Sequence, residues 1–280
     1  MIGRNLKLGL CVTGALLASA IVAQGASAIA GTTAFTCKKV EPKAGTAGFS
    51  KAHCKTSDAV STGAEYEHFT IEQGKTTELT GTNEGTGAET NATSIWRLRS
   101  TIAGVPIELS ADGVHAEGTL VNVLEPSGEH VAKGEGTVTF TKVKVTQPVG
   151  SKCEVFTDNG GAPGAVEVVH STALKGTTKG QGHSVKIEPV AGNVLATFII
   201  EKCVEPFKVL EGTYAVIGSV TGIPDGATLN FTHSTTTESK TLHLKSAVGP
   251  VAGLEGSITL SGRANNTEPF TPLSPTTVVT

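Results

Sequence analysis

The most constraining feature of this sequence is an alternating stretch at residues 134–146, Gly-Glu-Gly-Thr-Val-Thr-Phe-Thr-Lys-Val-Lys-Val-Thr. Val138 and Phe140 fall on one side of an extended chain, and the threonines between them fall on the other. This period of two is expected of a β-strand with one buried face. The apolar phase changes after Thr141, because the next valines stand at odd positions. We interpret the change as a β-bulge that keeps both halves of one strand on the same core.

The Glu-Gly-Thr tripeptide inside this stretch recurs before other alternating runs. Copies begin at Glu117 and Glu211, and a serine version begins at Glu255. Short alternating runs separated by turns rich in Asp, Pro and Gly are typical of sandwiches and barrels. The sequence therefore predicts an all-β fold, an antiparallel β-sandwich or barrel-like fold, as a single domain over residues 29–263. A second interpretation divides it into two β halves that meet near residues 157–164.

Three segments carry more specific expectations. Residues 194–200 are almost continuously apolar, which predicts a central strand buried on both faces. Phe69 and Ile71 alternate with His68 and other polar residues, so we expect the two apolar side chains to face the core. Residues 264–280 hold three prolines and many threonines, which predicts a flexible tail.

The first 28 residues have the pattern of a secretory signal peptide. Arg4 and Lys7 precede an apolar stretch at residues 8–23, and Ala26-Ser27-Ala28 is a small-residue cleavage site. We therefore expect export through the general secretory route and a secreted or cell-surface location. The apolar stretch is short for a membrane span and no later segment is long enough, so no span is expected after cleavage. An uncleaved N-terminal anchor is the alternative.

The charge balance excludes one class of partner. The formal net charge of −3 becomes −5 once the leader is removed, because the leader carries two basic and no acidic residues. A mildly acidic chain lacks the basic surface that neutralises several phosphates. Nucleic acid is therefore not an expected partner.

The cysteines predict crosslinks. Removing the leader with its one cysteine leaves four of the five, and an even number in an exported chain indicates two disulfides. We favour Cys37 with Cys54, which share an N-terminal segment, and Cys153 with Cys203, which each flank a strong β run. A zinc site that includes His53 is the alternative. No Cys-x-x-Cys or closely spaced His pair accompanies it, so we expect no metal and no cofactor.

Catalytic motifs are absent from the sequence. Neither a Gly-x-Ser-x-Gly nucleophile elbow nor His-Glu-x-x-His occurs. Histidines stand singly on polar faces of the alternating runs, so we expect them to be solvated. Aromatic residues make up only 4% of the chain, a poor supply for a carbohydrate cleft. The rival hypothesis is a secreted hydrolase whose site is assembled only in three dimensions, with candidate residues Glu65, Glu67, His68, Asp112 and His115.

Two other candidate sites follow from side-chain types. Arg97 and Arg99 share one face of a strand in a chain with few arginines, which predicts a site for an anionic ligand. The Asp158-Asn159-Gly160-Gly161 loop offers oxygen ligands for calcium. It contains only one carboxylate, so we interpret it as a turn.

Two N-terminal sequences carry a resemblance. Residues 31–37 read Gly-Thr-Thr-Ala-Phe-Thr-Cys, residues 48–54 read Gly-Phe-Ser-Lys-Ala-His-Cys, and Glu-Gly-Thr runs follow. In this combination the chain resembles a set of uncharacterised exported, β-rich, disulfide-containing proteins of actinobacteria, over most of its mature length. The resemblance implies export and a shared fold, and it implies no activity, cofactor or site residue.

The function we expect is that of a secreted or cell-surface bacterial protein without enzymatic activity. It would be a β-scaffold that presents loops to an extracellular partner or a cell-envelope component. The alternatives are the hydrolase above and a carrier of a small apolar ligand, which requires a hollow barrel. A filled core without a pocket at the candidate residues counts against both alternatives.

Overall fold

The computed structural model describes residues 34–42, 44–83, 95–126, 130–157, 163–175, 184–232, 240–245, 249–264 and 269–274. The predicted signal peptide, the candidate calcium loop and most of the 157–164 loop lie outside the described residues. Within them, the paired strands are antiparallel and the only helices are two short 3-10 turns, η1 (Thr56–Asp58) and η2 (Phe207–Leu210). The predicted antiparallel all-β fold is confirmed.

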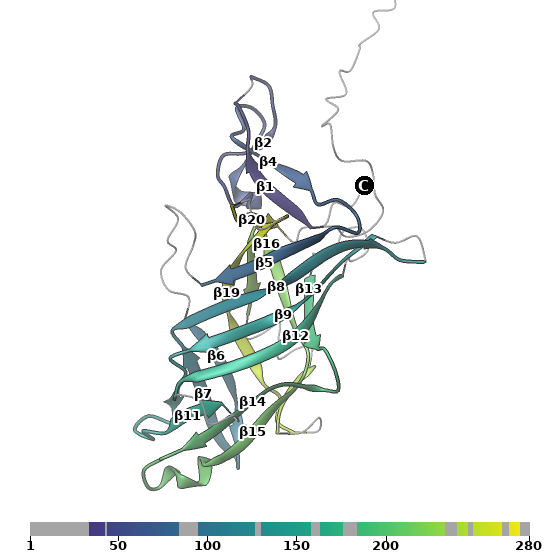
Figure 1. The fold of residues 1–280 in the computed structure, drawn as a ribbon. Helices are drawn as coiled ribbons and strands as arrows, with labels where there is room; N and C mark the ends of the chain where they lie inside the picture. Colours follow the sequence, from purple (N-terminus) through teal and green to yellow (C-terminus); the bar gives the residue numbers. More distant parts are fainter. Residues whose placement is uncertain are drawn as a thin grey trace, which may run out of the picture.

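Sheet A crosses the middle of the molecule (Figure 1). It consists of β5 (Thr76–Thr82), β8 (Gly113–Leu124), β9 (His130–Thr141), β12 (Ala165–Lys175), β13 (Ser184–Pro189), β16 (Val220–Asp225), β17 (Thr228–Phe231) and β19 (Gly253–Arg263). Neighbours in this order are paired, and β19 also pairs with β5. The pairings therefore form a circuit, which makes the sheet barrel-like.

Sheets C and B lie at opposite ends of the molecule (Figure 1). Sheet C consists of β6 (Trp96–Ile102), β7 (Val105–Ala111), β10 (Lys144–Gln147), β11 (Glu154–Thr157), β14 (Val194–Glu201), β15 (Gly212–Gly218) and β18 (Leu242–Leu244). Sheet B, at the N-terminal end, consists of β1 (Phe35–Lys39), β2 (Gly48–Phe49), β3 (Ala59–Val60) and β4 (Tyr66–Thr70). The first residues of β19 pair with β6, so β19 joins sheets A and C.

One connected apolar core runs through the interior. Phe198 and Ile200 of β14 and Leu242 of β18 are almost fully buried, and each such side chain stabilises the fold by roughly 1.5–3 kcal/mol. β14 is central, as expected, because it pairs with both β11 and β15. Burial on both faces is not found along its whole length, since Val194 is exposed and Ile199 is half-buried.

The predicted bulge near Thr141 is wrong, because the strand ends there and the polypeptide continues into a strand of another sheet. β9 ends at Thr141 in sheet A, Lys142 takes a φ of 53°, and β10 begins at Lys144 in sheet C. The left-handed residue redirects the chain between the two sheets. The apolar alternation on each side of it therefore serves a different sheet.

Part of the tail predicted to be flexible is a strand. β20 (Thr271–Ser274) pairs with the start of β1 and with the end of β19, and it thereby joins sheet B to sheet A. Leu273 is fully buried. A single apolar side chain and two short strand pairings thus order a segment whose proline content predicts flexibility.

Candidate functional site

The predicted anion site, Arg97 and Arg99 on β6, lies beside two carboxylates. Arg99 donates from Nε to Glu108 at 2.7 Å and from Nη1 to Glu255 at 2.8 Å. Nε of Arg97 lies 3.7 Å from Oε1 of Glu108, and its Nη1 lies 3.6 Å from Oε1 of Glu255. The two positive and two negative charges balance, so an incoming anion has to compete with carboxylates that are already in place.

Glu108 on β7 is the centre of this charge cluster. Burial opposes its ionisation, but hydrogen bonds from Thr146 and Arg99, together with the charges of both arginines, lower the pKa of Glu108. The hydrogen bond to Glu108 is the main reason that the pKa of Arg99 is raised. The arrangement is that of a structural ion-pair network across neighbouring strands, and the anion site remains a prediction.

The residues named for a hydrolase lie in two separate places. Glu67 and His68 belong to β4 of sheet B and Glu65 directly precedes it, whereas Asp112 lies between β7 and β8 and His115 lies near the start of β8. Neither of the two cavities described below is lined by any of them. In the described part of the chain, no group of three or more His, Cys, Asp or Glu side chains is placed to hold a metal ion. No helix among the described residues has the length and apolarity to cross a bilayer.

The inward orientation predicted for Phe69 and Ile71 holds for Ile71, which is buried, and is wrong within β4, because His68 faces inward and Phe69 outward. The His68 ring lies 5.4 Å from the Phe35 ring and 4.7 Å from the Phe49 ring, measured between centroids. Its Nε2 is buried without a hydrogen-bond partner among the described residues, and burial lowers the pKa of His68. The expected solvation of the histidines fails here and at His53, which is buried.

Both predicted disulfides are present. Cys37 of β1 pairs with Cys54, which stands just before η1, and the bond ties the loops of sheet B together. Cys153 pairs with Cys203, and the bond joins the start of β11 to the end of β14 in sheet C. The sequence separations are 17 and 50 residues.

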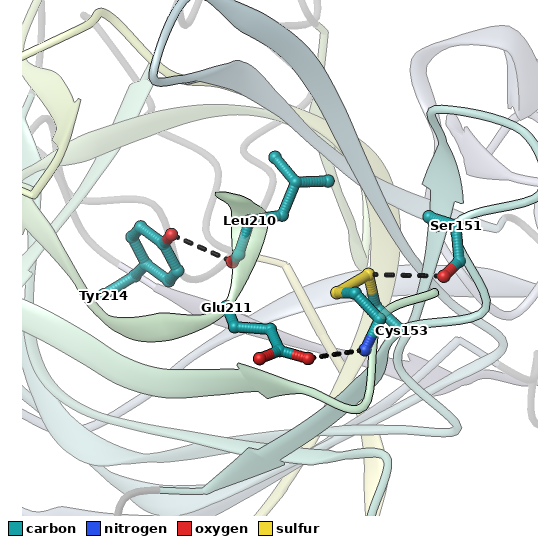
Figure 2. Close-up of a disulfide and its surroundings, with 6 residues drawn as sticks. Ser151, Cys153, Leu210, Glu211 and Tyr214 are labelled. Atoms are coloured by element: carbon teal, nitrogen blue, oxygen red, sulfur yellow. Dashed lines mark hydrogen bonds between the residues drawn. A yellow bond between two sulfur atoms is a disulfide. The ribbon is translucent and has the colours of Figure 1, made fainter. Parts of the chain in front are cut away.

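The loop between β14 and β15 closes around the second disulfide (Figure 2). The backbone N–H of Cys203 donates to Glu211 at 2.9 Å. The Tyr214 hydroxyl donates to the Leu210 carbonyl at 2.9 Å, and both side chains are buried. These contacts stabilise sheet C and leave its loop without a recess for a ligand among the cavities described below.

A cleft of about 450 Å³ lies where sheet B meets sheet A. One wall comes from β1 and β4, including Lys38 and Phe69, and the other comes from β5, β19 and β20, with Lys75 close to the start of β5. Figure 1 shows β20 at the junction of the two sheets. The volume is within the range of about 300–1,000 Å³ that is common for ligand pockets.

Two phenylalanine side chains are the only exposed Phe, Tyr or Trp side chains in the described part of the chain, and one lines this cleft while the other stands between two lining residues, Pro269 and Thr271. Phe69 lines it and is 42% exposed, and Phe270, just before β20, is 40% exposed. The Lys38 ammonium lies 5.8 Å from the centroid of the Phe69 ring, and the Arg263 guanidinium lies 4.5 Å from that of Phe270. Solvent-exposed rings paired with cations indicate a contact surface rather than a folding requirement.

The cleft is locally positive in a chain of negative net charge. It is lined by three cations, Lys38, Lys75 and Arg263, and by one carboxylate, Glu72. Lys75 lies 3.8 Å from Glu72, an exposed pair of the kind that contributes about 0–1 kcal/mol. Arg263 donates from Nε to Glu78 of β5 at 2.6 Å. Lys38 is exposed and has no acidic partner within the described residues.

Sequence reasoning missed this cleft. Its cations come from three segments far apart in the chain, and antiparallel pairing through β20 brings them together. The one available signal was Phe69, and the alternation around it indicated the opposite face.

A smaller cavity of about 80 Å³ lies in the core between sheets C and A, since Phe140 of β9 and Val166 of β12 line it together with residues of sheet C. Its lining is apolar and includes Trp96, Leu109, Phe198 and Leu242. An apolar cavity that holds a benzene-sized guest has a volume of about 150 Å³. The cavity is therefore smaller than a carrier of an apolar ligand requires.

No protein-family model matches this chain, and no curated protein or solved structure matches it either. A proposal for the function of the chain therefore has to rest on the residues and geometry described above.

Proposed function

We propose that this protein is a secreted or cell-surface bacterial β-scaffold without enzymatic activity, which binds an extracellular partner in the cleft between sheets A and B. The observation that carries the proposal is a cleft lined by cations and by an exposed aromatic ring, Phe69, with a second exposed ring, Phe270, packed against its lining residue Arg263. Aromatic rings and arginine are the side chains that contribute most to binding at protein surfaces. A cell-envelope component is the partner that fits an exported protein.

The two disulfides support the extracellular part of the proposal. Disulfides persist in oxidising compartments and are rare in the cytosol. Cys37–Cys54 belongs to the sheet that forms one wall of the cleft, so the crosslink stabilises the binding surface itself.

The placement of the acidic residues favours binding over hydrolysis. Two carboxylates that cleave a glycosidic bond face each other at roughly 5–10 Å across the substrate. Glu67 belongs to β4 and Glu65 directly precedes it, Asp112 lies between β7 and β8, and none of them lines the cleft. Glu72 is the one carboxylate in the lining, and it pairs with Lys75.

Co-sedimentation with isolated cell envelopes of the source bacterium tests the proposal. We expect the exported protein to sediment with the envelopes and the Phe69→Ala/Phe270→Ala variant to lose most of this retention. A matched control is Val149→Ala/Val209→Ala, which removes two exposed apolar side chains elsewhere on the surface. The proposal is wrong if the wild-type protein stays in the supernatant, or if the cleft variant sediments as the control does.

A further inference from the structure

We infer that the cleft between sheets A and B binds an acidic polysaccharide, a chain of sugars that carry carboxylate groups. This inference rests on the proposed function and names the ligand class of the same site. Three properties of the cleft carry it, namely its cations, the exposed rings of Phe69 within it and of Phe270 beside it, and the way its strand edges are paired.

The cations select an anionic ligand. Lys38 is exposed without an acidic partner among the described residues, so its ammonium is available to a carboxylate. Lys75 has only a long contact to Glu72, which a better-placed carboxylate replaces at little cost. Because the net charge of the chain is −3, general electrostatic attraction does not explain anion binding, and the local cluster has to provide it.

Arg263 is held in place for a planar anionic group. Its Nε and Nη2 both lie 2.6 Å from Oε2 of Glu78, and its guanidinium lies over the Phe270 ring. A guanidinium has five N–H donors, so groups beyond those two are left for a ligand carboxylate. Contacts on two sides fix its orientation, which lowers the entropy lost on binding.

The exposed rings and hydroxyls suit sugar rings. Phe69 offers a flat apolar face in the cleft against which the C–H face of a pyranose packs, and Phe270 extends the apolar surface beside Arg263. Thr70 and Thr271 also line the cleft. The exposed Thr70 hydroxyl can donate to and accept from sugar hydroxyls, and the Thr271 hydroxyl, which donates to the Gly262 carbonyl, can still accept. An acidic sugar polymer is the ligand that uses ring faces, hydroxyls and cations together.

The pairing of the strand edges argues against a peptide that binds by adding a strand. β19 has β5 on one edge and β17 and β20 on the other, and β5 lies between β8 and β19. The edge of β1 that faces away from β4 is paired with β20 at Phe35 and Thr36, which leaves only its last three residues open. An extended peptide gains its affinity from a longer open edge. The longest open edge at the cleft is that of β4 after Tyr66, its one residue paired with β2, so side chains carry most of the recognition.

Isothermal titration calorimetry with the full exported protein tests the inference. Polygalacturonate is the probe, and dextran is the uncharged control polysaccharide. We expect binding of polygalacturonate that weakens as salt rises, and no binding of dextran. Lys38→Gln/Arg263→Gln should weaken the affinity at least about tenfold, the loss of two charge-assisted contacts. Lys38→Gln alone should weaken it less, and it keeps the test valid if the double variant fails to fold. Lys202→Gln is the matched control, because Lys202 also lies over a phenylalanine ring and pairs with a glutamate.

Each other outcome overturns a defined part of the account. If the protein sediments with envelopes and loses this retention in the Phe69→Ala/Phe270→Ala variant, but does not bind polygalacturonate, the ligand class is wrong and the proposed function stands. If the protein does not sediment with envelopes either, both the ligand class and the proposed function are wrong. Equal or tighter binding of poly-glutamate points to an acidic peptide, and that of a single-stranded oligonucleotide to nucleic acid, and either result overturns the inference. Polygalacturonate binding that is unchanged in the cleft variants also overturns it.

Discussion

Gly118 of β8 and Gly136 of β9 lie directly opposite each other across an antiparallel strand pair. Each is the central residue of a Glu-Gly-Thr tripeptide, so two copies of the repeated motif face one another. A Cβ on Gly118 would lie 2.8 Å from Cα of Gly136 and would overlap the carbonyl oxygen of Glu135. The glycines of these two copies are therefore required for the close approach of the strands.

Gly118→Ala should destabilise the fold. The added methyl group meets backbone atoms, which cannot rotate away, and overpacking of this kind costs about 1–3 kcal/mol. Urea unfolding followed by circular dichroism measures the loss. Glu135→Ala is the control because that side chain is exposed on the neighbouring strand, and equal effects of the two substitutions would contradict the packing argument.

The two disulfides should differ in what they stabilise. Cys153→Ser/Cys203→Ser opens a longer loop inside sheet C and should lower the global free energy of unfolding, by up to about 4 kcal/mol in the chain-entropy model. Cys37→Ser/Cys54→Ser should loosen sheet B and leave the core of sheets A and C folded, because sheet B contributes little to that core. Limited proteolysis with mass mapping separates the two effects. Cleavage of the Cys37→Ser/Cys54→Ser variant that is spread evenly over sheets A, B and C would contradict this assignment.

Acid should destabilise sheet B through His68. Burial lowers the pKa of His68 in the folded protein below its ordinary value of about 6.5, so the unfolded chain binds a proton that the folded chain resists. Stability is therefore fully present above about pH 6.5 and falls as the pH is lowered through and below that value. His68→Phe should flatten this part of the profile of thermal midpoint against pH. A variant profile with the same slope as the wild type would assign the acid sensitivity to other groups.

The charge cluster on sheet C should act on stability and not on retention of ligand. Glu108→Gln removes the partner of two arginines, and a loss of about 1 kcal/mol is expected because the cluster is partly exposed. Hydrogen bonds and arginine charge lower the pKa of Glu108, so its contribution is present above the ordinary glutamate range and is lost as the pH falls through the lowered value. Arg97→Gln/Arg99→Gln should leave envelope retention unchanged. A loss of retention in this folded variant would instead support the anion site predicted from the sequence.

The local part of the fold was predictable from the sequence. Alternation and turns specify strands, and two pairs of cysteines that flank strands specify the crosslinks. The junctions between sheets were not predictable. After Thr141 the apolar residues move from even to odd positions, and this shift is the same for a β-bulge as for a chain that passes from one sheet to another. The face of β4 depends on the packing of His68 between Phe35 and Phe49, which is a tertiary effect.

The cleft depends on long-range pairing, which no local pattern encodes. Arg263 and Phe270 come from the end of the chain, and Lys38 and Phe69 from its start. β20 brings the two groups together, within a segment whose prolines predicted a flexible tail. The low aromatic content correctly indicates that few rings are available, and only the fold shows that one exposed ring lines the cleft and the other lies against its lining residue Arg263.

Hydrogen–deuterium exchange of the exported protein, with and without polygalacturonate, tests the central claim most directly. Bound ligand should slow exchange in β1 and β4 around Lys38 and Phe69 and in the segment from Arg263 through β20, while β6 and β7 stay unchanged. Protection centred on Arg97 and Arg99, or no protection at all, would contradict a binding site in the cleft between sheets A and B.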